Sequence, residues 1–334
     1  MVRQINPSLA RLWTSNNSKQ YGTSPRTRLE NLSEAELRVL DYLEAGVTES
    51  QFPHLPTLTK SSPEQVGSLL ARLGPLITKT SAFLSELSAL DVERHFTEIM
   101  RLYLLEHEDP AAALAKRAAS KVFISSLCRT GLTTLRGLAA SGIGAVFTAD
   151  QRMVSKSDTL DLGYPLHFLG KQRAQAAKTL VSGTRVELHS RMTQSYDRAE
   201  IAILIASDVV EPARYSSWMN RDVPHIAIVY SESGVQISHL VMPGITPCLA
   251  CLELSHLKED KQWAKVAPQL NQLDRDLSDS SLSLFSSSIA INQALNLIDG
   301  YEFESRRLQT KMDRDGSVYQ LEVPETNCGC RLAQ

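Results

Sequence analysis

The sequence lacks three features that mark nucleic-acid-binding, membrane or exported proteins. Its formal net charge is −2, so it has no basic excess to hold phosphates or an anionic lipid surface. Its longest apolar runs, such as residues 201–206, are far too short to span a bilayer. The first residues, MVRQINP, do not contain the apolar segment of a signal peptide. We therefore expect a cytoplasmic protein with neither a nucleic acid nor a membrane as its partner.

Cysteine is scarce too, but four of the five cysteines stand in two close pairs. Cys248 and Cys251 form C-x-x-C, and Cys328 and Cys330 form C-x-C. Two thiolate pairs supply the four soft ligands of a tetrahedral structural zinc, and a shell of four sulfurs leaves no position for a reactive water. Gly329 permits the sharp turn that a one-residue spacer needs. The pattern predicts a structural zinc knuckle. Two disulfides, or cysteines buried as small apolar residues, are the alternatives.

The first part of the chain predicts a small module of strands and short helices. Apolar stretches at residues 9–13 and near Tyr21 are typical of a hairpin. Ser33 with Glu36, and Ser62 with Gln65, are capping boxes that begin two helices. We predict a winged-helix-like module over residues 1–80. An ordinary helical appendage is the alternative.

The remainder of the chain predicts an α/β domain. Amphipathic patterns indicate a helical connector over residues 81–120, and strands and helices alternate from residue 122 onward. This alternation predicts a Rossmann-like, mostly parallel, doubly wound sheet over residues 121–334. The expected strands are 122–125, 145–149, 185–188, 201–206, 225–230 and 318–323, and the expected helices are 132–140, 174–181, 215–220 and 289–298.

The first strand–turn–helix is where a doubly wound fold normally binds phosphate. The usual fingerprint there is G-x-G-x-x-G, whose first two glycines let the backbone approach a pyrophosphate. Here the three positions are Ser126, Cys128 and Gly131. Only the glycine that permits helix–strand packing is retained. We expect the turn to persist as a degenerate nucleotide loop and to hinder a triphosphate.

Three charged residues are further candidates for a nucleotide site. Asp150 follows the second strand at the place where an acidic residue binds a ribose hydroxyl. Lys171 begins a helix and can face phosphate. Asp208 follows a buried strand at the carboxyl edge of the sheet, and it is the candidate catalytic and magnesium-binding residue. The alternatives are a turn residue for Asp150, a solvated charge for Lys171 and a loop cap for Asp208.

The order of these segments resembles the ThiF/MoeB/HesA superfamily of ubiquitin-activating-like adenylating enzymes. The resemblance covers roughly residues 115–334 and includes PCLAC at the first cysteine pair. It implies an ATP-adenylating Rossmann-like fold, a structural zinc and a homodimer. The chain departs from the family in its glycine loop. Residues 157–161 replace the family's Asn-x-x-Arg-Gln stretch, and residues 252–327 contain no candidate catalytic cysteine.

A narrower resemblance includes the N-terminus. Segments PSLARLW, LSEAEL and PGITPCLACLEL, with Trp263, are similar to actinobacterial ThiF-like proteins related to leader-peptide-binding partners of azole-forming cyclodehydratases. This resemblance implies a winged-helix peptide clamp before a ThiF-like body that often cannot use ATP. A precursor peptide would add a strand to the clamp's exposed sheet edge.

Two functions follow, and a third is disfavoured. The first is a scaffold that binds a peptide or protein carboxyl terminus and presents it to a partner enzyme of the cyclodehydratase type. The second is an active ATP- and Mg²⁺-dependent adenylating enzyme acting on such a terminus. The third, a nucleic-acid regulator, requires a basic face, yet residues 33–73 contain six acidic residues and only Arg38, Lys60 and Arg72 as basic ones.

Overall fold

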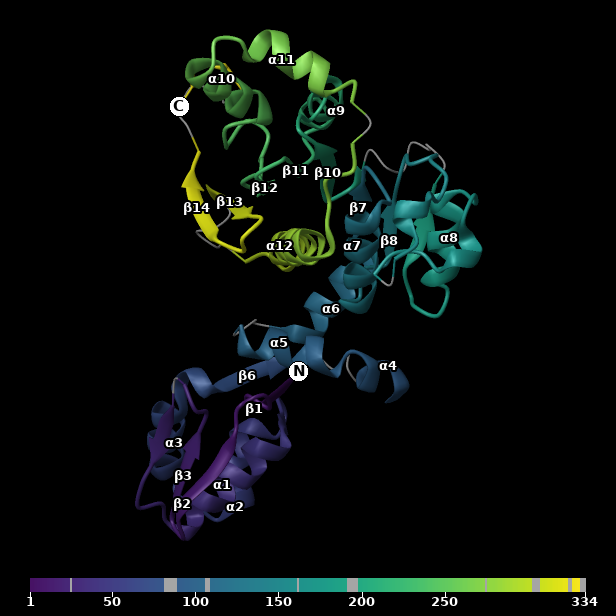
Figure 1. Cartoon of the computed structure of the whole chain (residues 1–334). Helices are drawn as coiled ribbons and strands as arrows, with labels where there is room; N and C mark the ends of the chain where they lie inside the picture. Colours follow the sequence, from purple (N-terminus) through teal and green to yellow (C-terminus); the bar gives the residue numbers. More distant parts are fainter. Residues whose placement is uncertain are drawn as a thin grey trace. The chain divides into compact units, whose positions relative to one another are not determined.

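The computed structural model describes residues 1–24, 26–80, 89–105, 109–160, 162–190, 198–273, 275–301, 307–323 and 326–330. The chain divides into two compact units, Met1–Ala115 and Lys116–Gln334 (Figure 1). Residues 81–88 and 106–108 of the predicted helical connector lie outside the described residues.

The first unit contains two small antiparallel sheets and several helices. One sheet has the order β5-β1-β6 and the other the order β2-β3-β4. The strands are β1 Val2–Ile5, β2 Arg11–Ser15, β3 Ser18–Tyr21, β4 Thr27–Leu29, β5 Val47–Thr48 and β6 Ile77–Thr80. The helices are α1 Glu34–Ala45, α2 Leu55–Thr59, α3 Pro63–Leu73, α4 Ala89–Arg94, α5 Phe96–Leu104 and α6 Pro110–Ala119, which crosses the boundary of the unit.

Local sequence signals explain the elements of the first unit. The side chain of Ser33 accepts the backbone N–H of Glu36, and the backbone N–H of Ser33 donates to the Glu36 carboxylate, so α1 begins with the predicted capping box. Ser62 and Gln65 do the same for α3. The expected hairpin is confirmed as β2 paired with β3. The buried core of the first unit contains apolar residues of β1, β3, β4 and β5 and of the helices α1, α2 and α3.

The second unit is built on one eight-stranded sheet of order β14-β13-β12-β11-β10-β7-β8-β9. The five strands from β11 to β9 run parallel, and the three beyond β11 run antiparallel. The strands are β7 Lys121–Ile124, β8 Ala145–Phe147, β9 Glu187–His189, β10 Ile201–Ser207, β11 His225–Tyr230, β12 Gly234–Ile237, β13 Leu308–Asp313 and β14 Val318–Glu322. The prediction of a mostly parallel α/β sheet is confirmed.

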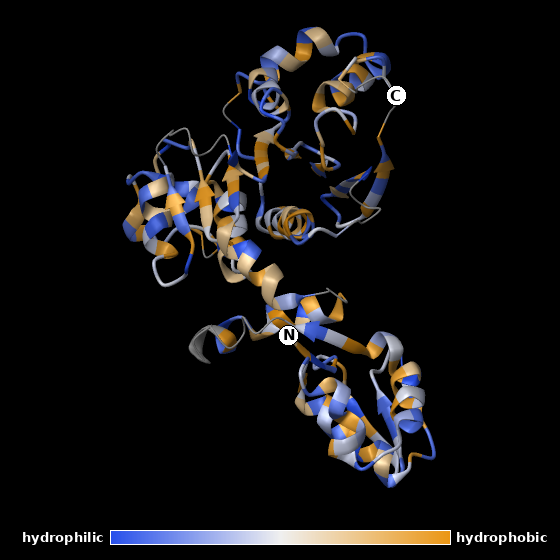
Figure 2. Ribbon diagram, turned by 180° about the vertical axis from the view of Figure 1, so that it is seen from behind, coloured by the Kyte–Doolittle hydropathy of each residue, from blue (hydrophilic) through white to orange (hydrophobic). Residues whose placement is uncertain are grey.

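Both faces of this sheet are covered, as a doubly wound fold requires. The odd-numbered residues Ile201, Ile203 and Ile205 of β10 belong to one apolar core, while Ala202 and Leu204 belong to the other. Apolar runs without alternation are typical of strands buried on both faces. Figure 2 shows the corresponding apolar ribbons in the central strands. The helices are α7 Arg129–Ala140, α8 Arg173–Leu180, α9 Pro212–Met219, α10 Leu249–Glu259, α11 Trp263–Leu270 and α12 Ser280–Asp299.

The strand order reverses between β7 and β10, and this positions the candidate site. From β7 the chain continues through β8 to β9 at one edge, and then returns to β10 on the other side of β7. In open α/β sheets, ligands bind at such a switch point, outside the carboxyl ends of the strands. Within the described ranges, none of the helices combines the length and the apolar character that crossing a bilayer requires.

Candidate functional site

The degenerate glycine turn lies between β7 and α7. At Gly131 an added Cβ would lie 1.7 Å from the carbonyl oxygen of Ser126, so only glycine fits. The hydroxyl of Ser126 accepts the backbone N–H of Cys128 at 3.2 Å, and Arg152 donates to the same hydroxyl. The Ser126 side chain is therefore used to hold the turn and Arg152 together.

Asp150 lies at the carboxyl end of β8, and its carboxylate is fully engaged. One oxygen accepts from the backbone N–H and from Nε of Arg152, both at 3.0 Å. The other accepts from the backbone N–H of Leu127 at 2.7 Å, from Arg152 Nη2 at 3.3 Å and from Arg173 Nη1 at 3.4 Å. Burial alone would raise the pKa of Asp150, but Arg152 and the two backbone donors outweigh it and hold that pKa below its usual value.

Arg173 was not identified from the sequence, yet it is the central cation of this network. Its guanidinium binds Asp158 through Nε at 3.0 Å and through Nη2 at 2.8 and 2.9 Å, in addition to Asp150. Burial lowers the pKa of Arg173, but the charges of Asp158 and Asp150 raise it more, so the group stays ionised. Its only sequence signal is its place two residues after Lys171, at the beginning of α8.

Asp208 follows β10 and is paired as well. Arg275 donates to both of its carboxylate oxygens, from Nη2 at 2.7 Å and from Nε at 3.2 Å, and also to Glu232 at 2.8 Å. The backbone of Asp208 has φ +62°, a left-handed conformation that few residues other than glycine, asparagine and aspartate adopt. Such strain is characteristic of functional sites, where surrounding structure maintains it.

Lys171 is placed differently from the other candidates. Its side chain is exposed, and its ammonium nitrogen lies 5.3 Å from the centre of the Phe168 ring. Its backbone carbonyl accepts the N–H of Val154 at 2.8 Å. Among the described residues that line the cavity beside the glycine turn, Lys171 does not occur.

That cavity has a volume of about 530 Å³ and lies at the carboxyl ends of β7, β8, β10 and β11. Ser126 and Cys128 of the turn form part of its wall. Asp150 and Asp208 are not among the lining residues, but their arginine partners are: Arg152 and Arg173 bind Asp150, and Arg275 binds Asp208. Among the described residues, Arg152, Arg173, Arg214 and Arg275 line the cavity. The arrangement can hold an anionic group at the switch point of the sheet.

The four paired cysteines converge on one point, as their spacing predicts. Their Sγ atoms all lie within 4.8 Å of one another. Neighbouring sulfurs are 3.5 Å apart for Cys251 and Cys330, 3.7 Å for Cys248 and Cys328, and 3.9 Å for Cys248 and Cys251. A tetrahedron with Zn–S bonds of about 2.3 Å has edges of about 3.8 Å, whereas a disulfide needs about 2.05 Å. The cluster can hold a metal ion, and all its cysteines are free thiols. Gly329 has φ +72° and makes the turn between the last two.

Comparison with known proteins gives a match in fold rather than in sequence. No protein-family model matches the sequence, and no curated protein matches it. The crystal structure of E. coli MccB with ATP matches with a TM-score of 0.68 and 13% identity, over 98% of this chain and 98% of that chain. The microcin C7 biosynthetic enzyme MccB with N-formylated MccA matches with a TM-score of 0.69, the same identity and the same coverage.

PaaA matches as well, with a TM-score of 0.67 and 17% identity, over 96% of this chain and 99% of that chain. These matches cover both units and are too distant in sequence to transfer an activity. The chain therefore has the fold of MccB and PaaA along nearly its whole length, which confirms at the level of the fold the ThiF-like resemblance of its sequence.

Proposed function

We propose that this chain is a ThiF-like scaffold that binds a peptide or protein carboxyl terminus and presents it to a partner modifying enzyme of the cyclodehydratase type, without adenylating it. One observation carries the proposal. The two carboxylates that a nucleotide-using site would offer to ribose and to magnesium, Asp150 and Asp208, are both occupied by arginines of the same chain.

The occupied carboxylates have no capacity left for a nucleotide. Five N–H groups already donate to the two oxygens of Asp150, so a ribose hydroxyl would have to displace an arginine or a backbone donor. A magnesium ion would have to displace Arg275 from Asp208, because a cation and a guanidinium cannot share the same carboxylate oxygens without repulsion. Lys171, the expected phosphate ligand, is exposed and points its charge at Phe168.

The N-terminal residues 1–80 act in this proposal as a winged-helix-like peptide clamp. Among the described strands, β4 pairs only with β3, so its other edge offers unpaired backbone groups to a peptide strand. Arg72, in the last turn of α3, donates to the carbonyl of Glu30 just after β4, so the end of α3 is tied to the end of β4, and in this proposal α3 supplies the wall of the peptide groove. MccB, which shares the fold, is solved in complex with N-formylated MccA.

The cysteine cluster holds zinc in this proposal. Four thiolates at tetrahedral spacing favour zinc, and a closed shell of four sulfurs gives the metal a structural role. Cys248 immediately precedes α10 and Cys251 lies in its first turn, so the metal would attach residues 328–330 to α10. Free thiols in such a site suit the cytoplasmic location that the sequence predicts. We further propose that the body, residues 121–334, forms a homodimer, as the resemblance implies, with residues 81–120 as the helical connector.

The second candidate function is ATP- and Mg²⁺-dependent adenylation of the bound carboxyl terminus. The observation that favours it is the arginine-lined cavity of about 530 Å³ at the switch point of the sheet, where Arg152 and Arg275 can contact phosphate. E. coli MccB, with the same fold, is solved with ATP. Adenylation by this chain would require Arg275 to release Asp208.

Pyrophosphate exchange distinguishes the two functions. We expect no ATP–pyrophosphate exchange above background, whether or not peptide is present. Exchange that the unmodified protein supports and that the Asp208→Asn variant loses would establish adenylation. Asparagine tolerates the left-handed backbone at this position, so this variant tests the charge alone.

Hydrogen exchange tests the clamp. The probes are synthetic peptides encoded by the short reading frames beside the gene. We expect a bound peptide to protect the amides of β4 but not those of β2. Among the described strands β2 also pairs on one side only, so it serves as the internal control. Equal protection of both strands, or of neither, would contradict the assignment to β4.

A further inference from the structure

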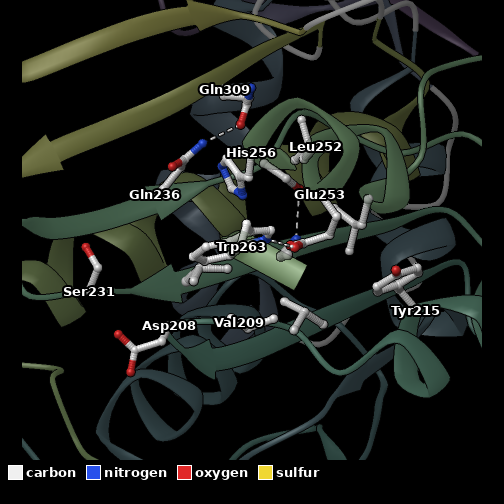
Figure 3. Close-up of a pocket in the computed structure, with 15 residues that line it drawn as sticks. Asp208, Val209, Tyr215, Ser231, Gln236, Leu252, Glu253, His256, Trp263 and Gln309 are labelled. Carbon is white, nitrogen blue, oxygen red and sulfur yellow. Dashed lines mark hydrogen bonds between the residues drawn. The ribbon is translucent and has the colours of Figure 1, made fainter. Parts of the chain in front are cut away.

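A second pocket lies in the second unit between the sheet and the helices α10 and α11 (Figure 3). Its volume is about 190 Å³. Most of its wall is apolar, and Val209, Leu252 and Trp263 are among the residues that form it. Pockets for whole small molecules are about 300–1,000 Å³, so this one has the size for a single large side chain.

The polar groups of the pocket are arranged to leave an aromatic wall. Glu253 accepts the indole N–H of Trp263 at 2.7 Å and fixes the orientation of that ring. The ring of His256 meets Trp263 edge-on, with 5.1 Å between centroids and 74° between planes. Gln236 donates to Gln309 at 2.5 Å, and this amide pair lies on the same side of the pocket as His256 in Figure 3. Glu253 with Trp263, and Gln236 with Gln309, therefore bind one another, whereas Nδ1 of His256 has no hydrogen-bond partner among the described residues. The rest of the wall is mostly apolar and favours an apolar occupant.

The pocket adjoins the arginine-lined cavity. Val209 lines both, and Asp208 on the rim of the pocket binds Arg275, which lines the cavity. A peptide whose terminal carboxylate reaches the guanidinium of Arg275 therefore has its last side chain beside Val209. Arg275 donates three of its five N–H groups to Asp208 and Glu232, so the two that remain are those that would hold a peptide carboxylate. The pocket complements an apolar side chain.

We propose that this pocket binds the side chain of the carboxyl-terminal residue of the bound peptide, and that this residue is bulky and apolar, with an aromatic ring as the best fit. The inference rests on the proposed function, because it names the class of carboxyl terminus that the scaffold accepts. It does not depend on whether ATP is used.

The test uses the full-length protein labelled with fluorotryptophan, and the probes are acetyl-Gly-Gly-X peptide acids with X as Phe, Leu, Ala or Asp. Fluorine NMR observes three tryptophans: Trp263 in the pocket, Trp218 in the core around Phe123, and Trp13 in the first unit. We expect millimolar Phe peptide to shift the Trp263 resonance and leave the other two unchanged. The dissociation constant for Phe should be at least about tenfold lower than for Ala, since burying a large apolar side chain is worth that much.

Matched variants of α10 complete the test. Leu252→Trp fills the pocket and should abolish the preference for Phe over Ala. Leu254→Trp makes the same change on an exposed part of the helix, outside the pocket lining, and should keep the preference. Unchanged Trp13 and Trp218 resonances verify that each variant is folded.

Equal affinity for Phe and Ala, or no Trp263 shift with any peptide, would overturn the pocket assignment. Pyrophosphate exchange together with a retained Phe preference would overturn the scaffold function and leave the pocket intact. The two failures are therefore distinguishable.

Discussion

Replacing Asp150 by asparagine tests whether this carboxylate serves the fold or a nucleotide. The Asp150 side chain is 2% exposed, and its two oxygens accept five N–H groups. Asparagine retains one acceptor oxygen and replaces the other with an NH₂ group that faces donors. If this group replaces the oxygen that binds Leu127 and Arg173, the buried N–H of Leu127 loses its partner, which costs about 1–3 kcal/mol. The break in the pairing with Arg173 raises the total to about 3 kcal/mol, at the lower end for a disrupted buried ion pair.

The measurement is the free energy of unfolding from urea denaturation of Asp150→Asn, with Asp222→Asn as the control. Asp222 is exposed and has φ +53°, a conformation that asparagine tolerates, so the same chemical change there should alter stability by less than about 0.5 kcal/mol. Because the pKa of Asp150 is lowered in the folded state, its contribution to stability is complete above the ordinary aspartate pKa of 3.8 and is lost as the pH falls from there through the lower folded-state pKa. A loss below about 1 kcal/mol for Asp150→Asn would refute the reasoning and leave the carboxylate available to a ligand.

Three further predictions concern the metal, pH and the glycine turn. Protein purified without chelator should contain one zinc per chain by elemental analysis. Cys328→Ser should lose the metal and destabilise the fold, whereas Cys128→Ser, outside the cluster, should retain the metal. Wild-type protein without metal would contradict the metal-binding role of the cluster. Burial lowers the pKa of His225 from 6.5 to about 4. As the pH falls, His225 is therefore protonated in the unfolded chain before it is protonated in the folded one, so stability should decline by about 3 kcal/mol between pH 6.5 and 4. His225→Phe should remove this decline. An unchanged pH dependence in this variant would contradict the assignment of the decline to His225. The double variant Ser126→Gly with Cys128→Gly should fold and gain no affinity for ATP in calorimetry, because glycine leaves the arginine–carboxylate pairs in place. Micromolar binding of ATP by this variant would show instead that the turn alone blocks the nucleotide.

Signals that are local in sequence predicted their elements well. The capping boxes at Ser33 and Ser62 depend on residues three apart, and both helices begin where these boxes place them. The buried strand Ile201–Ser207 is apolar on both faces, which a short sequence window reveals. The cysteine cluster was predictable because the chemistry of a metal site restricts residue type and spacing so strongly.

Elements whose stability comes from distant contacts were predicted less well. The predicted helix at residues 289–298 in fact begins at Ser280, because the side chain of Asp279 caps it and accepts the N–H of Leu282. The serines of its first turns have modest helix propensity, yet Ser283, Ser286 and Ser287 are buried against other elements. The strand expected at residues 185–188 begins two residues later and ends one residue later, at Glu187–His189, where it pairs with β8.

The candidate site, too, could be predicted only as far as local sequence signals allow. Candidate acids could be found from their places after strands, but their partners could not. Arg173 reaches Asp158 and Asp150, which lie 15 and 23 residues away, and Arg275 reaches Asp208 across 67 residues. No periodicity or motif encodes such pairs, because the topology of the sheet brings them together. The occupied state of the carboxylates, on which the proposed function depends, was therefore accessible only from the structure.

Calorimetric titration of the full-length protein with Mg²⁺–ATP tests the central claim most directly. We expect no heat of binding at millimolar ATP, because Asp150 and Asp208 are held by Arg152, Arg173 and Arg275. Binding with micromolar affinity, lost in the Asp208→Asn variant, would contradict the scaffold and establish a nucleotide-using enzyme.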